Sequence, residues 1–323
     1  MREIALVTGG AGFIGSHLVD LLLQQGWTVR VLDNISSGTR DNLIGKSDHL
    51  ELVEGDIRDA AICNRAASGA SAVFHLAGMA SVGDAVANPP LAHEVNLTGT
   101  QNMLMAARDA GVRRFVCSSS TSVYGNAETI PTSETQAIRP LSPYASQKAA
   151  AELYCRNFCD LYGLETVMLR YFNVFGPRQS IYSGYAAAIP KFVHAAISNS
   201  TPIVFGDGLQ TRDFVYVGNV AYANLLAATA EGVAGETFNI GCGESISLLD
   251  LLDELRTITG AELKPEFRET RPGDVRHSRA DISHARALLG YTPEFSLPEG
   301  LRRTVSEAAN KMADPVPLEA ANL

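Results

Sequence analysis

Residues 4–15 read IALVTGGAGFIG, a short apolar run that leads directly into a loop of closely spaced glycines. The apolar run predicts a buried β-strand, and residues 12–25 continue with the apolar spacing of a helix. Between them, Gly9, Gly12 and Gly15 form a Gly-x-x-Gly-x-x-Gly pattern. In this context the glycines permit a tight turn and let a pyrophosphate approach the backbone N–H groups at the helix start. We therefore predict a dinucleotide-binding loop rather than an ordinary turn between strand and helix.

Strand-length apolar runs alternate with helical spacing along the first half of the chain. The expected strands cover residues 4–7, 28–32, 50–53, 72–76, 114–117 and 164–169, and the expected helices cover 12–25, 59–67, 92–110 and 143–162. Such alternation is typical of α/β proteins in which a parallel sheet is covered by helices. We predict a Rossmann-type, doubly wound parallel sheet.

The regular alternation ends near Asn173. We expect a dinucleotide-binding domain over residues 1–172 and a smaller mixed α/β substrate lobe with a C-terminal tail over 173–323. A return segment near 211–240 should bring the apolar run 237–240 back to the main sheet. Helices are expected near 186–199 and 248–259, a functional loop over 125–143, and a frayed end from Met312.

Composition excludes several classes of function. The 323 residues are 46% hydrophobic and 19% charged, and 26 Lys and Arg against 35 Asp and Glu give a net charge of −9. An acidic chain argues against a general nucleic-acid surface, so a phosphate ligand needs a dedicated pocket. Five cysteines without a paired spacing or a nearby His cluster predict reduced thiols, a cytoplasmic protein and no metal site. Apolar runs too short for a signal peptide or a membrane span predict no membrane association.

The second expected strand ends beside Asp33, which bears on the choice of cofactor. A carboxylate here can accept hydrogen bonds from the adenosine ribose hydroxyls and would repel a 2′-phosphate. Asn34 follows, rather than Arg or Lys. The sequence therefore favours NAD over NADP.

Tyr144 and Lys148 lie four residues apart on the expected helix over 143–162, so their side chains share one face. An ammonium beside a phenol favours the phenolate, which can act as a base. A surface Tyr beside a surface Lys is the simpler alternative. The hydroxyl run 118–122 (SSSTS) favours the catalytic interpretation, because it follows the strand 114–117 at the sheet edge where ligands bind. Most of these hydroxyls would equally suit a polar turn.

The glycine loop, the serine run, Tyr144-x-x-x-Lys148 and the motif LRYFN (169–173) together resemble the extended short-chain dehydrogenase/reductase superfamily, in particular its nucleotide-sugar epimerases. The resemblance covers nearly the whole chain. The segments LSPYA (141–145), NVFGPRQ (173–179) and RPGDVRHS (271–278) are most similar to those of bacterial UDP-N-acetylglucosamine 4-epimerases. The resemblance implies reversible C4 epimerisation of a UDP-hexose, through a 4-keto intermediate with tightly bound NAD. The implied substrates are UDP-GlcNAc and UDP-GalNAc, with UDP-Glc and UDP-Gal as a second pair.

The resemblance also implies three sets of site residues. The catalytic residues would be Ser120, Tyr144 and Lys148. The cofactor-binding residues would be Gly9, Gly12, Phe13, Ile14, Gly15, Asp33, Asn34, Ser37, Gly38, Asp56, Ile57, Leu76, Ala77, Gly78, Asn96, Ser118, Tyr144, Lys148 and Tyr171. The substrate-binding residues would be Ser81, Ser120, Ser122, Tyr144, Asn173, Gln179, Phe205, Arg212, Arg271, Asp274 and Ser278. Arg212 and Arg271 would place positive charge against the diphosphate, although Arg271 would equally suit a surface ion pair with a neighbouring acid.

Two positions depart from the glucose/galactose epimerase pattern. Met79-Ala80 stand where those enzymes often have Lys, which puts a nearby phosphate or cofactor contact in doubt. Ser278 stands where a bulky Tyr would crowd the C2 side of the sugar. The smaller side chain leaves room for an N-acetyl group.

Other functions on the same fold are weighed against the epimerase. A UDP-glucuronate decarboxylase or a nucleotide-sugar 4,6-dehydratase also begins with C4 oxidation, but the dehydratases carry an Asp-Glu pair where this chain has Thr121-Ser122. A non-enzymatic NAD-binding regulator would be expected to lose the catalytic Ser, Tyr or Lys. The family also implies a homodimer through two helices, here residues 96–111 and 143–162. Leu97, Met103, Leu104 and Leu153 fit either that interface or the core.

Overall fold

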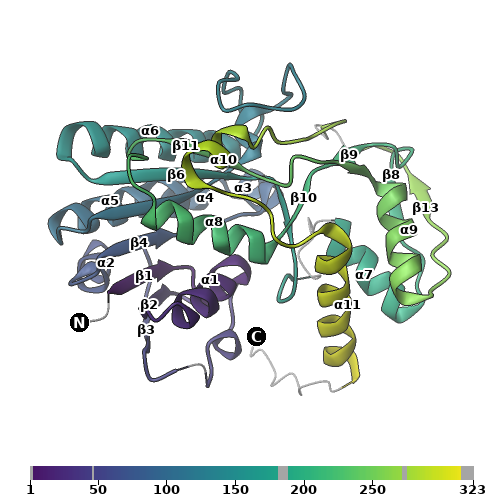
Figure 1. Ribbon diagram of the computed structural model, residues 1–323, viewed down its shortest axis with the longest axis horizontal. Helices are drawn as coiled ribbons and strands as arrows, with labels where there is room; N and C mark the ends of the chain where they lie inside the picture. Colours follow the sequence, from purple (N-terminus) through teal and green to yellow (C-terminus); the bar gives the residue numbers. More distant parts are fainter. Residues whose placement is uncertain (1–2, 46, 181–187, 271–274, 314–323) are drawn as a thin grey trace.

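A parallel seven-stranded sheet forms the centre of the computed structural model, which describes residues 3–45, 47–180, 188–270 and 275–313 (Figure 1). The strands are β1 (Ile4–Thr8), β2 (Thr28–Asp33), β3 (Leu50–Glu54), β4 (Ala72–His75), β5 (Arg114–Ser120), β6 (Glu165–Tyr171) and β11 (Thr237–Ile240). Their order is β11-β6-β5-β4-β1-β2-β3, and every neighbouring pair is parallel. The direction of winding reverses between β1 and β4, where doubly wound sheets form a ligand crevice. The predicted Rossmann-type sheet is confirmed.

Helices cover both faces of the sheet. One layer contains α1 (Phe13–Gln24), α8 (Val217–Thr229) and α10 (Ser283–Leu289), and the other contains α2 (Ala60–Ala67), α5 (Gly99–Asp109) and α6 (Pro143–Tyr162). A sheet buried on both faces needs apolar side chains on both. Every residue of β4 is accordingly buried, and this is why the strands are recognisable as continuous apolar runs.

The single helix expected over residues 92–110 is wrong in its start and its regularity. It is preceded by α3 (Val82–Ala87), and the segment itself comprises α4 (Pro89–His93), a π-helical turn at Glu94–Thr98, and α5. The start signal is Asn88 before Pro89, because the Asn88 side chain accepts a hydrogen bond from Leu91 N at 3.2 Å. Such π turns are frequent at functional sites, and this one contains Asn96.

The remaining elements form a smaller lobe with its own apolar core, to the right of the sheet in Figure 1. Its helices are α7 (Ala188–Ser198), α9 (Leu248–Thr259) and α11 (Leu297–Ala313). Its paired strands are β7 (Asn173–Phe175) with β10 (Phe214–Tyr216), β8 (Ile203–Phe205) with β13 (Glu266–Arg268), and β9 (Thr211–Arg212) with β12 (Ile246–Ser247). Two 3₁₀-helices, Arg40–Asn42 and Thr121–Tyr124, complete the described elements.

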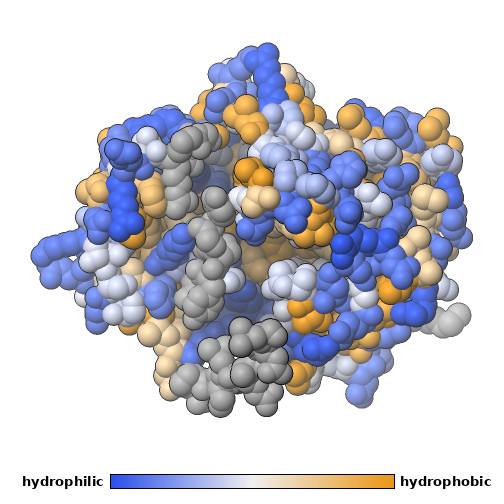
Figure 2. Space-filling view, turned by 180° about the vertical axis from the view of Figure 1, so that it is seen from behind, coloured by the Kyte–Doolittle hydropathy of each residue, from blue (hydrophilic) through white to orange (hydrophobic). Residues whose placement is uncertain are grey.

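The chain returns from the smaller lobe to the sheet through α8 and β11. α8 contacts α1, and β11 pairs with β6 from Thr237 opposite Met168 to Ile240 opposite Tyr171. The five cysteines are free thiols. Of the helices in the described ranges, none is long and apolar enough to cross a membrane. Figure 2 shows a face on which hydrophilic residues predominate and hydrophobic residues form small separate patches.

The four apolar residues that fitted either a dimer interface or the core differ in burial. Met103 and Leu104 are fully buried and belong to the core between the sheet and its helices. Leu97 is partly buried. Leu153 is 61% exposed, so it alone of the four points clearly into solvent.

Candidate active site

The glycine loop between β1 and α1 allows no larger residue at two of its positions. Gly9 has φ +71°, and a Cβ atom there would lie 2.8 Å from Ala77 N in the segment after β4. A Cβ atom on Gly15 would lie 2.1 Å from Gly9 O. Gly12, the residue before α1, has no side chain that could cap the first turn of the helix. The amides of this turn are therefore available to an anion such as a pyrophosphate.

Phe13 and Ile14, which the resemblance placed at the cofactor, lie in that first turn of α1. Their side chains are partly buried and pack against the core of the smaller lobe. Their backbone N–H groups belong to the turn that would face a dinucleotide. This suits a phosphate contact, which needs N–H donors rather than apolar side chains.

Asp33 at the end of β2 holds the glycine loop in place. Its Oδ2 accepts from Ala11 N at 2.9 Å and its Oδ1 accepts from Ile35 N at 2.8 Å. Each carboxylate oxygen has a second lone pair, which suits the two hydroxyls of a ribose. A Cβ atom on Gly38 would lie 2.6 Å from the Ala11 carbonyl, so this glycine also borders the loop.

The other residues expected around the adenosine lie at the ends of β2 and β3. Asn34 Nδ2 donates to Asp56 Oδ2 at 2.9 Å. The Arg58 guanidinium, 2.8 Å from the same carboxylate, lowers the pKa of Asp56 to about 2. Ile57 is buried in the core beside α5, and Ser37 is exposed beside Gly38. The structure thus places this part of the predicted cofactor set at one edge of the sheet.

The segment after β4, Leu76 to Gly78, is held between β1 and α6. Ala77 N donates to Thr8 Oγ1 at 3.1 Å, and Asn96 Oδ1 accepts from Met79 N at 2.8 Å. Asn96 Nδ2 donates in turn to Gln147 Oε1 of α6 at 2.9 Å. A Cβ atom on Gly78 would lie 3.0 Å from Asn96 Oδ1 and 3.7 Å from Lys148 Nζ, so this segment borders the expected catalytic lysine.

His75 is a buried polar residue near Lys148 that the sequence did not single out. Its ring lies between Thr8 Oγ1 at 2.9 Å and Thr100 Oγ1 at 3.0 Å. Burial, together with the charge of Lys148, lowers the pKa of His75 to about 3, so the ring is neutral at physiological pH. The available signal was a polar residue at the end of an apolar strand run.

The three expected catalytic residues come from α6 and β5. Lys148 is buried and its Nζ donates to Ser118 O at 2.9 Å, with Ser118 Oγ at 3.4 Å. Tyr144 is buried one turn before it, against Ala85 and Ala92. Ser120 is the last residue of β5 and accepts from Ser122 N at 3.1 Å. α6 contacts β5, β6 and the 3₁₀-helix after Ser120, which brings the two segments together.

β5 is three residues longer than expected. Ser118, Ser119 and Ser120 pair with Leu169, Arg170 and Tyr171 of β6, so they belong to the strand rather than to a turn. Only Thr121 and Ser122 enter the following 3₁₀-helix. Pairing with the neighbouring strand outweighs the weak strand preference of serine.

The side chains of Tyr171 and Gln179 differ in whether their polar atoms already have a hydrogen-bond partner. The Tyr171 hydroxyl donates to Asn224 Oδ1 of α8 at 3.0 Å inside the core, so it is not directed to a ligand. Asn173 Nδ2 donates to Asp213 O at 3.2 Å. Gln179 Nε2 donates to Val174 O, whereas its buried Oε1 has no hydrogen-bond partner among the described residues. A buried amide oxygen without a donor is an acceptor available to a ligand.

The expected substrate residues of the smaller lobe lie on its short strands and on the segments between them. Phe205 ends β8 and Arg212 ends β9. Ser278 N donates to Thr211 O at 3.1 Å, which brings Ser278 beside β9. Ser81 lies apart from them at the start of α3, where its Oγ accepts from Asp84 N. Within the described part of the chain, Ser122 Oγ is buried without a hydrogen-bond partner, while Arg271 and Asp274 lie outside that part.

This arrangement defines a Rossmann-type protein of the short-chain dehydrogenase/reductase class, with a glycine-loop dinucleotide site adjoining a Tyr-Lys pair. The family model for the NAD dependent epimerase/dehydratase family matches residues 5–241. The chain therefore belongs to that family, whose cofactor is NAD.

Similar proteins span almost the whole chain. The UDP-glucose 4-epimerase of Mycolicibacterium smegmatis is 42% identical over 95% of this chain and 98% of its own length. The structure of UDP-N-acetylglucosamine 4-epimerase from Methanobrevibacter ruminantium, in complex with UDP-N-acetylmuramic acid, is 38% identical, with a TM-score of 0.92 over 97% of this chain and 100% of that chain. UDP-glucose 4-epimerase from Thermus thermophilus, in complex with NAD, is 35% identical, with a TM-score of 0.84 over 94% of this chain and 98% of that chain.

Proposed function

We propose that this chain is a UDP-sugar 4-epimerase that interconverts UDP-GlcNAc and UDP-GalNAc, with UDP-Glc and UDP-Gal as a second substrate pair. One observation carries the proposal: Tyr144 and Lys148 lie buried on one face of α6, at the carboxyl end of β5 where Ser120 stands. Lys148 lies next to the segment after β4, and this segment in turn borders the glycine loop. The epimerase names of the similar proteins support the same reaction.

The residues around the glycine loop fit NAD. The amides after Gly12 would hold the pyrophosphate, and Asp33 would accept from the adenosine ribose hydroxyls. Lys148 would lie at the nicotinamide end, because it borders Gly78. When bound, NAD would supply the acceptor, and later the donor, of the hydrogen at C4 of the sugar.

The chain's own residues would handle the proton of the C4 hydroxyl. The Lys148 ammonium, fixed by Ser118 O, places a positive charge on the face of α6 that carries Tyr144. Tyr144 would take the hydroxyl proton and later return it. Ser120 Oγ would hydrogen-bond to the same sugar oxygen and hold it in place during the transfer.

Epimerisation further requires that the 4-keto sugar rotate in the site and present its opposite face, while its nucleotide stays bound. Arg212 and Asn173 would hold the diphosphate, and Phe205 lies on strand β8 of the same lobe. Ser278 N donates to Thr211 O, so Ser278 lies beside strand β9, which ends at Arg212. A short side chain leaves space for a C2 N-acetyl group, so Ser278 supports the acetylated pair as the preferred substrates.

The test is product identification after incubating purified protein, without added cofactor, with UDP-GlcNAc and separately with UDP-Glc. UDP-GalNAc forming faster than UDP-Gal is the expected result. Faster reaction of UDP-Glc would contradict the role of Ser278 and leave the reaction class intact. A chain that forms neither epimer would contradict the proposal, and UDP-glucuronate should then be tested for decarboxylation.

We also infer that the protein is a cytoplasmic homodimer. Met105 on α5, and Leu153, Leu161 and Tyr162 on α6, are exposed apolar residues on two adjacent helices. Covering them with a second copy would remove apolar surface from water. Sedimentation of the wild type against Leu153→Lys tests the dimer, because a charge among these apolar residues should shift the mass toward the monomer. The free thiols are consistent with a reducing compartment.

A further inference from the structure

Glu152 continues the face of α6 that carries the expected catalytic pair. Tyr144, Lys148 and Glu152 follow one another at intervals of four residues. The Glu152 carboxylate is almost completely buried and faces Arg170 of β6, which is buried to the same degree. Arg170 Nε donates to Glu152 Oε1 at 2.9 Å, and Arg170 Nη2 donates to Glu152 Oε2 at 2.7 Å. The two residues thus form a bidentate ion pair inside the protein.

This ion pair joins the segments that carry the site residues. Ser119 Oγ donates to Glu152 Oε1, so the carboxylate is attached to β5 between Ser118 and Ser120. Arg170 Nη1 donates at 2.8 Å to the hydroxyl of Tyr124, which ends the 3₁₀-helix containing Ser122. The Arg170 guanidinium also lies 4.7 Å from the centre of the Tyr124 ring. The pair therefore connects α6, β5, β6 and the 3₁₀-helix.

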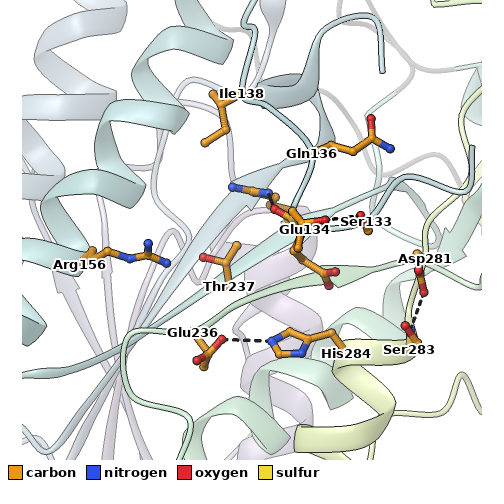
Figure 3. Close-up of a pocket in the computed structure, with 12 residues that line it drawn as sticks. Ser133, Glu134, Gln136, Ile138, Arg156, Glu236, Thr237, Asp281, Ser283 and His284 are labelled. Carbon is orange, nitrogen blue, oxygen red and sulfur yellow. Dashed lines mark hydrogen bonds and ion pairs between the residues drawn. The ribbon is translucent and has the colours of Figure 1, made fainter. Parts of the chain in front are cut away.

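The network ends at a polar cavity of about 490 Å³ beside β11, which Figure 3 shows. The Tyr124 hydroxyl donates to Asn239 Oδ1 at 2.6 Å, and Asn239 N donates to Glu134 Oε1 at 2.7 Å. Arg170 Nη1 also donates to Glu134 O at 3.3 Å. Because these buried polar groups are partners of one another, the network favours a single arrangement of the elements that carry them.

Two hydrogen-bonded contacts fix α6 against β5. Lys148 Nζ is bonded to Ser118, and Glu152 is bonded to Ser119, the next residue of the strand. One such contact would leave the helix free to turn about it, whereas two contacts one helical turn apart set its rotation and height. Tyr144 lies one turn before Lys148 on the same face, and Ser120 follows Ser119. The position of Tyr144 relative to Ser120 therefore depends on the Glu152–Arg170 ion pair.

We propose that Glu152 and Arg170 are positioning residues, which hold Ser120 and Tyr144 at the separation that proton transfer at the sugar C4 hydroxyl requires. This inference rests on the proposed epimerase function. Neither residue needs to touch the substrate. A buried ion pair contributes little net stability compared with apolar side chains of similar size, so its value here lies in the geometry that it imposes.

The chain offers a matched control in Arg114. Arg114 is the first residue of β5, is buried, and donates from Nε and Nη2 to Glu165 at 3.2 Å and 2.9 Å. Glu165 is the first residue of β6 and stands directly opposite Arg114. The control pair therefore joins the same two strands at their amino ends, away from Ser120.

The experiment compares Glu152→Gln, Arg170→Lys and the control Arg114→Lys with the wild type. Each protein is assayed for kcat and KM with UDP-GlcNAc, for NAD content after purification, and for thermal unfolding. We expect kcat of Glu152→Gln and Arg170→Lys to fall about 100-fold, as for a misplacement of about 1 Å, with KM changed by less than about threefold. NAD content should match the wild type, and Arg114→Lys should keep its kcat even where its unfolding temperature falls.

Three results would overturn the proposal: an unchanged kcat in Arg170→Lys, an equal loss of kcat in Arg114→Lys, or unfolding of Glu152→Gln and Arg170→Lys at a temperature where Arg114→Lys is folded. The last would assign the pair to folding alone. A wild type that forms no epimer from either UDP-sugar would instead refute the proposed function, on which this inference rests.

Discussion

Acidification should lower the free energy of unfolding of this protein through His75, which is buried between β1 and α5. The Thr100 hydroxyl donates to Asn96 O at 2.7 Å, so Thr100 Oγ1 must accept from His75 Nε2–H. His75 Nδ1 therefore carries no proton and accepts from the Thr8 hydroxyl. A second proton on the ring would set two donors against each other, and burial already lowers the pKa of His75 to about 3.

The magnitude follows from the difference in pKa between the folded and the unfolded chain. In the unfolded chain His75 has its ordinary pKa of 6.5, so between pH 6.5 and 3 only the unfolded state takes up the proton. The stabilisation is complete above pH 6.5 and is lost as the pH falls toward 3. At pH 5 the loss is about 2 kcal/mol, from 1.36 kcal/mol per pKa unit.

Urea unfolding of the wild type and of His75→Gln measures this contribution. Glutamine can supply one donor and one acceptor but does not titrate. Between about pH 7.5 and pH 5, the free energy of unfolding of the wild type should fall by about 2 kcal/mol more than that of His75→Gln, since all other titrating groups are shared. Parallel pH dependences for the two proteins would refute the assigned tautomer and the neutral buried ring.

Three further predictions concern the proposed site. Tyr144→Phe and Lys148→Met should each lower kcat by about 100-fold or more while NAD content, measured after denaturing the purified protein, falls far less; equal losses would assign these residues to binding. Gly15→Ala should purify without NAD, because its Cβ would lie 2.1 Å from Gly9 O, and an unchanged NAD content would contradict this fit. Ser278→Tyr should lower kcat/KM for UDP-GlcNAc relative to UDP-Glc, as measured by competition between the two sugars, and an unchanged ratio would contradict the steric role of Ser278.

The strands and most helices were predictable because burial leaves a periodic record in the chain. The expected strand over 28–32 and the helix over 143–162 agree with β2 and α6 within a residue. Buried parallel strands must be apolar on both faces, and a helix start with Pro at its first position carries a local signal. The glycine loop was equally predictable, since its spacing between a strand and a helix reflects a local steric requirement.

Contacts between distant segments left no such record. The extension of β5 to Ser120 depends on pairing with β6, and the π turn at Asn96 accompanies side-chain contacts to Met79 and Gln147. The roles of His75 and Arg170 likewise depend on partners far along the chain. Single-sequence periodicity describes which face of an element is buried and not which polar groups meet there.

The apolar pattern, which the sequence shows, and the polar contacts between distant segments, which it does not show, have different physical roles. Apolar packing assembles the sheet and tolerates exchanges of similar volume, whereas the buried polar contacts of Asp33, His75, Lys148 and Glu152 fix the loops and strand ends at the carboxyl edge. Ser278, by contrast, belongs to the smaller lobe and contacts none of these four groups through a hydrogen bond within the described part of the chain. Changes at Ser278 should therefore alter the choice of sugar while leaving the proton transfer at Tyr144 intact. Changes at Glu152 should impair the proton transfer at Tyr144 while leaving the choice of sugar unaltered.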